Sequence, residues 1–94
     1  MPTTPVPVPA TRELVDDLRR ICADAVEIPL DKVTAEADLV ADLGIDSLTM
    51  DELLVIVLDR YGMPGKVNTI SAMSYPTIRA LADLIQHLDG ERNR

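Results

Sequence analysis

The chain has 94 residues, enough for one small domain, and 47 % of them are apolar, so the domain can bury a core. Only 2 % are aromatic, with no Trp or Phe, so this core must consist of Leu, Ile, Val, Ala and Met. A net charge of −7 argues against nucleic acid, because phosphate binding needs a basic surface. The charge favours partners that present Lys and Arg patches, although a solubilising surface is the simpler explanation of it.

Membrane and redox features are missing from the sequence. No stretch is long and apolar enough to cross a membrane, and the N-terminus lacks a basic-then-apolar signal pattern, so we expect a cytoplasmic protein without membrane contact. Cys22 is the only cysteine, which excludes an intramolecular disulfide. It lies on the apolar side of a helical pattern, which favours a small core residue over a nucleophile.

The N-terminal segment MPTTPVPVPA contains four of the seven prolines. Proline at alternate positions prevents regular hydrogen bonding and favours extended chain. We therefore expect residues 1–10 to be a disordered tail or linker.

The first predicted helix begins near Thr11, an acceptable N-cap, and Glu13 suits the positive end of its dipole. Pro29 ends it at or before Ile28. Apolar residues recur at helical spacing along one side, widened by two valines: Leu14, Val15, Leu18, Ile21, Cys22, Ala25 and Val26.

A long connection follows over residues 29–46. It carries apolar residues without a clean period, namely Leu30, Val33, Leu39, Val40 and Leu43. A loop this apolar should lie across the helices and bury those side chains, with a short helical turn around residues 39–43. Gly44 then permits a tight turn into the next element.

The second helix is predicted from Asp46 or Ser47 to Tyr61, and Gly62 and Pro64 stop it. The run LLVIVL would also suit a buried strand, but the length of the segment and its early acids favour a helix. One row should face the core: Leu53 or Leu54, Val57 and Tyr61. A second row combines apolar and acidic residues, namely Leu48, Glu52, Val55 and Asp59. Such a helix is either sandwiched in the core or presents a face to a partner.

The remaining elements are a short helix or 3₁₀ turn around residues 69–73 and a last helix that starts at Pro76 and Thr77. The stripe of the last helix is Ile78, Leu81, Ala82, Ile85 and Leu88. Gly90 is expected to stop it, which leaves residues 90–94 as a frayed polar tail. The sum is an all-α domain over residues 11–89, a small four-helix bundle with three main helices, a short third helix and a long loop between the first two.

Common catalytic and metal sites do not fit this sequence. His87 is the only histidine, and nothing in the sequence places it near Ser47 as a base. The acids of ADLGIDSLTMDEL fail as a calcium loop, because from Asp42 the sixth residue is Ser47 instead of glycine and the twelfth is Leu53 instead of Glu. We therefore expect neither a catalytic residue nor a metal site.

Ser47 is the residue that remains. At the start of a helix its hydroxyl lies near unpaired backbone N–H groups and the positive dipole end, which would stabilise an attached phosphate ester. Since the serine has no base of its own, an external enzyme would have to modify it. Plain helix capping by Asp46 and Ser47 is the alternative.

The sequence LGIDSL over residues 43–48, followed by an acidic-apolar helix, resembles the attachment motif of acyl carrier proteins. The order of elements over about residues 11–89 is similar too. The resemblance implies that Ser47 carries 4′-phosphopantetheine, transferred from coenzyme A by a separate magnesium-using phosphopantetheinyl transferase. The arm would hold an acyl group as a thioester, and Asp46 would help position the site for the transferase.

The resemblance also implies a docking face on the second helix, made of Leu48, Asp51, Glu52, Val55 and Asp59. It would meet basic patches on the transferase and on acyl-loading, ketosynthase-type or acyltransferase-type enzymes. The chain would then be a non-catalytic carrier, and we expect it to be a monomer.

Two departures from the fatty-acid type bear on the pathway. Asp51 stands where those carriers usually have a small apolar residue, and PGKVNTISAM, with Lys66, has no acid where they tend to be acid-rich. This favours a carrier for polyketide or another specialised acyl product over one for primary fatty acid biosynthesis. A peptidyl or aminoacyl carrier is second, because such carriers commonly have Gly at the position of Asp46. An unmodified helical adaptor is the alternative outside the class.

Overall fold

The computed structural model describes residues 6–63 and 67–92. Within these ranges the chain forms four α-helices and one 3₁₀ turn: α1 (Thr11–Val26), η1 (Leu30–Lys32), α2 (Ser47–Arg60), α3 (Thr69–Ala72) and α4 (Ile78–Arg92). The described residues contain no strand, and only Asp38 and Thr77 form an isolated β-bridge. The predicted all-α class, with a short third helix and a long first connection, is confirmed.

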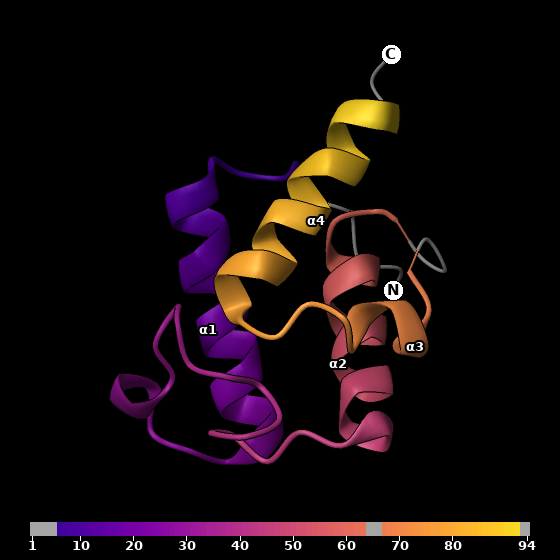
Figure 1. Cartoon of the computed structure of the whole chain (residues 1–94). Coiled ribbons are helices and arrows are strands. Elements are labelled where there is room, and N and C mark those ends of the chain that lie inside the picture. Colours follow the sequence, from indigo (N-terminus) through magenta and orange to yellow (C-terminus); the bar gives the residue numbers. More distant parts are fainter. Residues whose placement is uncertain (1–5, 64–66, 93–94) are drawn as a thin grey trace, which may run out of the picture.

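The three long helices enclose one core, with α1 packed against both α2 and α4 and with α3 against α2. Figure 1 shows the connection between α1 and α2 crossing the lower end of the bundle, where α2 begins, while α4 runs to the opposite end. No helix in the described part of the chain is long and apolar enough to span a membrane.

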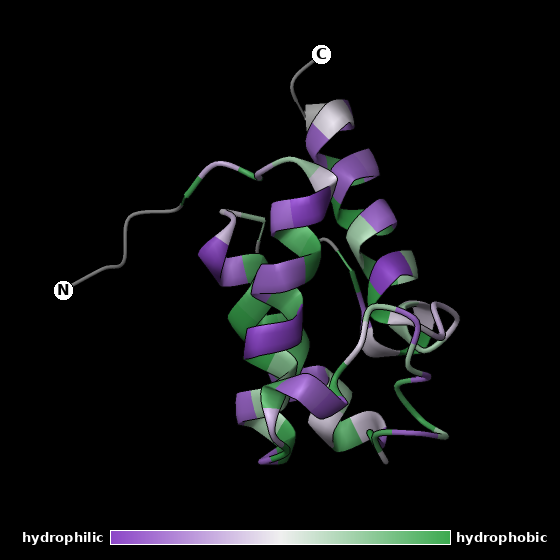
Figure 2. Cartoon of the chain, turned by 90° about the vertical axis from the view of Figure 1, so that its left-hand side faces the viewer, coloured by the Kyte–Doolittle hydropathy of each residue, from purple (hydrophilic) through white to green (hydrophobic). Residues whose placement is uncertain are grey.

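The core draws on both the helices and the connection. Figure 2 shows hydrophilic residues along the face of α1 that is turned to the viewer. Fully buried side chains include Leu14, Leu18, Val33, Leu39, Ile45, Met50, Leu53, Val57, Tyr61, Ile78, Leu81 and Ile85. Burying one such aliphatic side chain contributes about 1.5–3 kcal/mol, so the connection stabilises the domain as the helices do. The predicted core row of α2 is confirmed, with both Leu53 and Leu54 buried.

The last turn of α1 differs from the prediction, because Ala25 is exposed and Ala23 is buried instead. Glu27 adopts the left-handed conformation, with φ 56°, and reverses the chain. The N–H of Ile28 then donates to the carbonyl of Ala23 at 3.1 Å. The returning chain therefore lies beside Ala23, and helical spacing alone could not locate this reversal.

The ends of α1 and α4 also required correction. Ala10 is the N-cap of α1 instead of Thr11, and no side chain caps that end. The predicted stop at Gly90 was wrong, because α4 continues through it to Arg92. A glycine inside a helix costs only about 1 kcal/mol relative to Ala. The His87–Glu91 pair at 2.9 Å spans this glycine. Residues 93–94 of the predicted tail lie outside the described residues.

The second half of the predicted tail is bound to the domain. The N–H of Val6 donates to the carbonyl of Arg60 at the end of α2, at 2.9 Å. The side-chain amide of Gln86 in α4 donates to the carbonyl of Pro9, and Val8 packs against the core. Residues 6–10 therefore differ from the expected disordered tail, and residues 1–5 lie outside the described residues.

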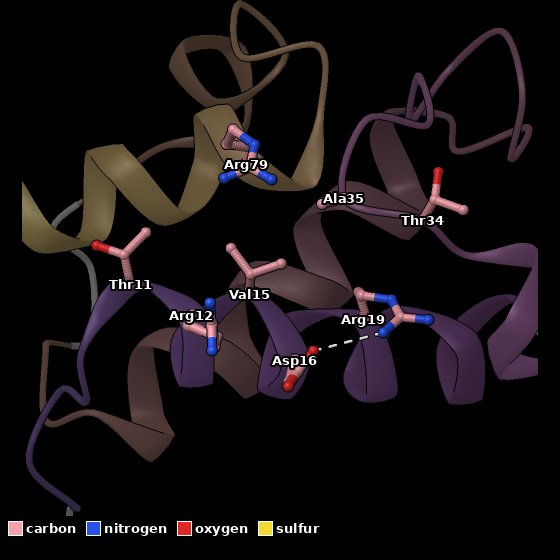
Figure 3. A pocket seen from close by; sticks show the side chains of 8 residues that line it. All are labelled: Thr11, Arg12, Val15, Asp16, Arg19, Thr34, Ala35 and Arg79. Carbon is pink, nitrogen blue, oxygen red and sulfur yellow. Dashed lines mark hydrogen bonds and ion pairs between the residues drawn. The ribbon is translucent and has the colours of Figure 1, made fainter.

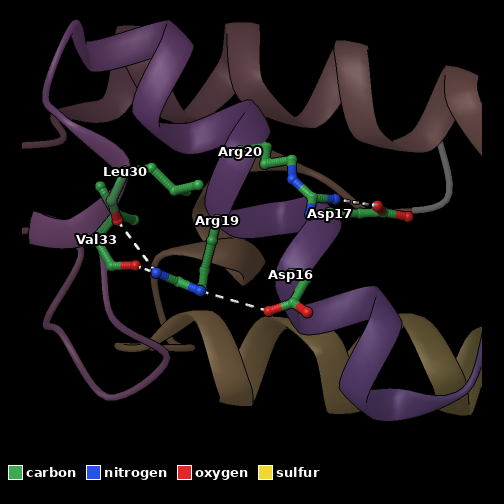
Figure 4. A network of polar contacts seen from close by, with 6 residues as sticks. All are labelled: Asp16, Asp17, Arg19, Arg20, Leu30 and Val33. Carbon is green, nitrogen blue, oxygen red and sulfur yellow. Dashed lines mark hydrogen bonds and ion pairs between the residues drawn. The ribbon is translucent and has the colours of Figure 1, made fainter.

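The connection is held to α1 by Arg19. Its guanidinium donates to the carbonyls of Val33 and Leu30, and it pairs with Asp16 at 3.4 Å (Figure 4). In the same figure Arg20 reaches back to Asp17. One side chain thus satisfies two loop carbonyls and fixes the loop against the helix.

The later part of the connection is held to the start of α4. The N–H of Leu39 donates to the carbonyl of Pro76 at 2.8 Å, and the N–H of Arg79 donates to that of Ala35 at 3.1 Å. The predicted helical turn is confirmed by a bond from the N–H of Asp42 to the carbonyl of Asp38 at 2.9 Å. Two apolar residues of the connection, Leu30 and Val40, are exposed, against the expectation that all would be buried.

A buried tyrosine joins the end of α2 to α1. Tyr61 is fully buried, and its hydroxyl donates to the carboxylate of Asp17 at 2.9 Å. Burial, with the adjacent Asp17 carboxylate, raises the pKa of Tyr61 to about 12. Arg60 lies 5.8 Å from the centre of the ring and also pairs with Asp17, at 3.9 Å.

We expect Tyr61→Phe to lower the free energy of unfolding by about 1 kcal/mol, because the ring still fills its site while the carboxylate loses a buried donor. Urea denaturation would measure this. Tyr75→Phe is the matched control, since the hydroxyl of Tyr75 makes no hydrogen bond within the described residues. An equal loss in both variants would contradict the assignment.

Candidate functional site

The N-terminus of α2 is capped by the aspartate that precedes the serine. Asp46 has extended backbone, and its carboxylate accepts a hydrogen bond from the N–H of Thr49 at 2.8 Å. Its own carbonyl accepts from the N–H of Met50 at 2.9 Å. The backbone hydrogen bond from Thr49 holds the pKa of Asp46 below its usual value of 3.8, so the cap is anionic at neutral pH. The predicted helix start is confirmed.

Ser47 is the first residue of α2, and it is exposed. Its hydroxyl makes no hydrogen bond to another described residue. Leu43 and Ile45, two residues apart just before it, are both buried and anchor the segment in the core. Between them Gly44 adopts φ +69°, which an L side chain rarely adopts, and no atom lies within 4 Å of where its Cβ would be. This turn brings the serine hydroxyl to the surface.

No group that could activate this serine has been identified in the part of the chain that the structure describes. The later part of α4 lies at the opposite end of the bundle from the start of α2 (Figure 1). His87 belongs to this part of the helix and pairs with Glu91. Cys22 is buried, and burial raises the pKa of its thiol to about 11. No group of three or more His, Cys, Asp or Glu side chains there could hold a metal ion. Among the residues that the structure describes, none is therefore positioned as a base for Ser47.

An exposed hydroxyl at this position fits a covalently attached phosphate. The phosphate would lie at the N-terminus of a helix of 14 residues, where backbone N–H groups and the positive end of the dipole stabilise negative charge. The side of the site at Gly44 is open. The arrangement therefore supports modification of Ser47 by another enzyme. An attached group could occupy the open space beside Ser47 without moving a buried side chain.

The second predicted row of α2 lies on the surface next to this serine. Leu48 is 68 % exposed and Val55 is 64 % exposed, and Asp51, Glu52 and Asp59 are also exposed. No ion pair between described residues involves these three acids. All five residues of the predicted docking face therefore lie on the surface, where acidic and apolar side chains are exposed together.

Two apolar residues beside this face were not selected from the sequence. Ile56 is 49 % exposed, and Ile70 on α3 is 85 % exposed. The hydroxyl of Thr69 donates to the carboxylate of Asp51 at 2.9 Å, which ties α3 to α2. The exposure of Ile56 could have been predicted from the apolar run LLVIVL, because a helix in a small domain cannot bury all of its sides. The exposure of Ile70 could not be predicted from apolar periodicity, since α3 has only four residues.

Comparison with known proteins gives similarity over most of the domain. A protein family described as "Phosphopantetheine attachment site" matches residues 16–85. An acyl carrier protein of Saccharopolyspora erythraea is 38 % identical over 52 residues, 55 % of each chain. Acyl carrier proteins of Thermobifida fusca, 38 % identical over 52 residues, and Helicobacter pylori, 34 % over 50, match 55 % and 53 % of this chain. The matches span 55, 66 and 64 % of these three relatives.

The cap gives a pH-dependent prediction. Because the pKa of Asp46 is lower in the folded state, its contribution to stability is present above the usual value of 3.8 and is lost as the pH falls through the folded value. We expect Asp46→Ala to lower the melting temperature at pH 7, because the N–H of Thr49 loses its acceptor.

Asp46→Asn is the control for charge, since Asn is an equally good N-cap that does not titrate. It should keep most of the stability at pH 7 and lose less than the parent between pH 5 and about pH 3. Thermal unfolding followed by circular dichroism would measure both variants. If Asp46→Ala melted like the parent at pH 7, the cap would not contribute.

Proposed function

We propose that this chain, which belongs to the family of phosphopantetheine attachment domains, is an acyl carrier whose 4′-phosphopantetheine arm is attached to Ser47. The observation that carries the proposal is the exposed hydroxyl of Ser47 at the first residue of α2, just after the anionic cap Asp46. When bound, the arm supplies a terminal thiol that holds an acyl group as a thioester.

The chain itself contributes position and charge. In the attachment step the oxygen of Ser47 would form a bond to the phosphorus that carries the pantetheine of coenzyme A. The pyrophosphate P–O bond to that phosphorus would break, and the adenosine 3′,5′-bisphosphate half of coenzyme A would leave with the bonding electrons. Its proton would go to the phosphopantetheinyl transferase, because the described residues offer no base. Leu43 and Ile45 are buried in the core and anchor the chain just before Ser47. The serine is then presented in one orientation, which lowers the cost of ordering it in a partner's active site.

The docking face would make this presentation specific. Its acids can meet Lys and Arg on a partner, and its apolar members Leu48 and Val55 can be covered in the same contact. Charge complementarity mainly speeds association, which suits a carrier that must visit the transferase and then several acyl-handling enzymes. We propose that these partners bind through basic patches.

We propose a polyketide or other specialised acyl pathway for this carrier. Asp51 supports this, because it stands where fatty-acid-type carriers usually have a small apolar residue. Its carboxylate also accepts a hydrogen bond from the hydroxyl of Thr69, which joins α3 to the docking face. The described residues of α3 carry no acid, and Ile70 is exposed there, so this helix offers a partner an apolar contact. Lys66 lies outside the described residues.

Intact mass measures the attachment directly. After incubation with coenzyme A, Mg²⁺ and a broad-specificity phosphopantetheinyl transferase, the parent should gain the mass of one phosphopantetheine, and Ser47→Ala should gain none. Ser71→Ala, which removes another exposed serine, should be modified like the parent. If a folded parent gained no mass with several transferases, the unmodified adaptor would become the better reading.

The docking face is tested by reversing its charge. Glu52→Lys with Asp59→Lys should reduce kcat/KM for modification of Ser47 at least about tenfold, and high salt should reduce the difference. Asp24→Lys with Asp31→Lys gives the same net charge through exposed acids elsewhere, and it should react nearly as fast as the parent. Equal losses in both double variants would mean that net charge matters and the face does not.

A further inference from the structure

An arginine-lined cleft of about 590 Å³ lies between the first half of α1, the connection near Ala35 and the start of α4. Figure 3 shows Arg79 pointing from α4 towards α1, with Val15 rising from α1 into the same space. The cleft does not include any residue of α2, so it is separate from Ser47 and from the docking face.

The charge of the cleft is opposite to that of the protein. The chain has a net charge of −7, yet Arg12, Arg19 and Arg79 line this cleft, with Asp16 as the one acid among its lining residues. Glu36 lies next to it and pairs with Arg79. Asp83 also acts on the charge of Arg79. Among the residues that line the cleft, three arginines stand against one acid.

Two of the three guanidiniums can accept a new anion. Arg12 is exposed and has no ion pair or side-chain hydrogen bond within the described residues. Arg79 pairs only with Glu36 there, and their side chains are 54 % and 68 % exposed. An exposed pair of this kind contributes little, so an incoming carboxylate can replace Glu36. Arg19 is not available for a new anion, because its guanidinium already donates to two carbonyls of the connection.

The walls of the cleft are held in place without a ligand. The N–H of Arg79 donates to the carbonyl of Ala35, and the β-bridge between Asp38 and Thr77 lies beside it. Arg19 fixes the connection to α1 from the other side. Arg12 on α1 and Arg79 on α4 are therefore presented from two anchored elements, which lowers the cost of ordering them on binding.

We propose that this cleft docks an acidic segment of a partner protein, with Asp or Glu carboxylates bound by Arg12 and Arg79. A guanidinium binds a carboxylate through two parallel hydrogen bonds, and Val15 and Ala35 supply apolar contact. A short acidic segment suits the site better than a nucleic acid, whose extended phosphate backbone would meet the acidic remainder of the surface. The proposal does not depend on modification of Ser47.

The test uses the full unmodified chain labelled with ¹⁵N and titrated with a hexaglutamate peptide, with hexaglutamine as the uncharged probe. Amide shifts should cluster at residues 11–19, 34–36 and 79. Arg12→Gln with Arg79→Gln should weaken binding about tenfold or more, whereas Arg20→Gln with Lys32→Gln removes the same charge outside the cleft and should bind like the parent. Arg12→Gln alone, at a residue without an internal partner, should also weaken binding and leave the fold unchanged.

Three outcomes would overturn the proposal. The first is the absence of clustered shifts, and the second is equal binding of hexaglutamine. The third is equal weakening in the two double variants. Citrate is titrated in parallel: shifts at the same residues with citrate and none with hexaglutamate would assign the cleft to a small carboxylate instead.

Discussion

The position of Ser47 depends on how the connection between α1 and α2 is held against the bundle. The 20 residues of mostly irregular chain at positions 27–46 would otherwise leave the start of α2 free to move, because ordering each residue costs about 1–2 kcal/mol. Arg19 binds two of its carbonyls, the N–H of Leu39 binds the start of α4, and Leu39 and Ile45 are fully buried. The connection thereby contributes to the core, and its anchoring also fixes the position of the backbone at Ser47.

The same connection separates two surfaces of opposite charge. On one side it leads into α2, whose exposed acids have no basic partner among the described residues. On the other side it forms a wall of the cleft that Arg12 and Arg79 line. Charges this exposed interact weakly across the domain in salt, since the screening length is about 8–10 Å. Each surface can therefore select its own partner by charge.

Most of the fold could be predicted from the sequence because the helices carry clear apolar periodicity. The buried row of α2 and the helix start at Asp46 followed from residue spacing and capping chemistry alone. Two of the failures share one cause, which is that tertiary contacts decided the outcome. Ala23 is buried because the chain reverses at Glu27, and residues 6–10 are held by bonds to α2 and α4. Gly90 remained helical because its local cost is small.

The site was predictable to a different degree. Ser47 stood out because its motif is local, and a local motif can be read without knowing the fold. Ile70 and the arginine cleft could not be found in this way, because each depends on which segments fold beside one another. Arg12 and Arg79 are 67 positions apart in the sequence, and only the packing of α1 against α4 brings them to one cleft.

The exposed apolar residues of α2 and α3 carry a cost in stability, which the proposed docking face would explain. Leu48, Val55 and Ile70 are largely exposed, whereas burying such a side chain would stabilise the fold by about 1.5–3 kcal/mol. A helix of 14 residues is marginal on its own, so α2 relies on its cap and on its buried row to remain ordered. The stability of α2 therefore comes from one side, and the other side is free to bind. The same division places the exposed hydroxyl of Ser47 at the edge of the exposed side, where a partner that covered Leu48 would also reach Ser47.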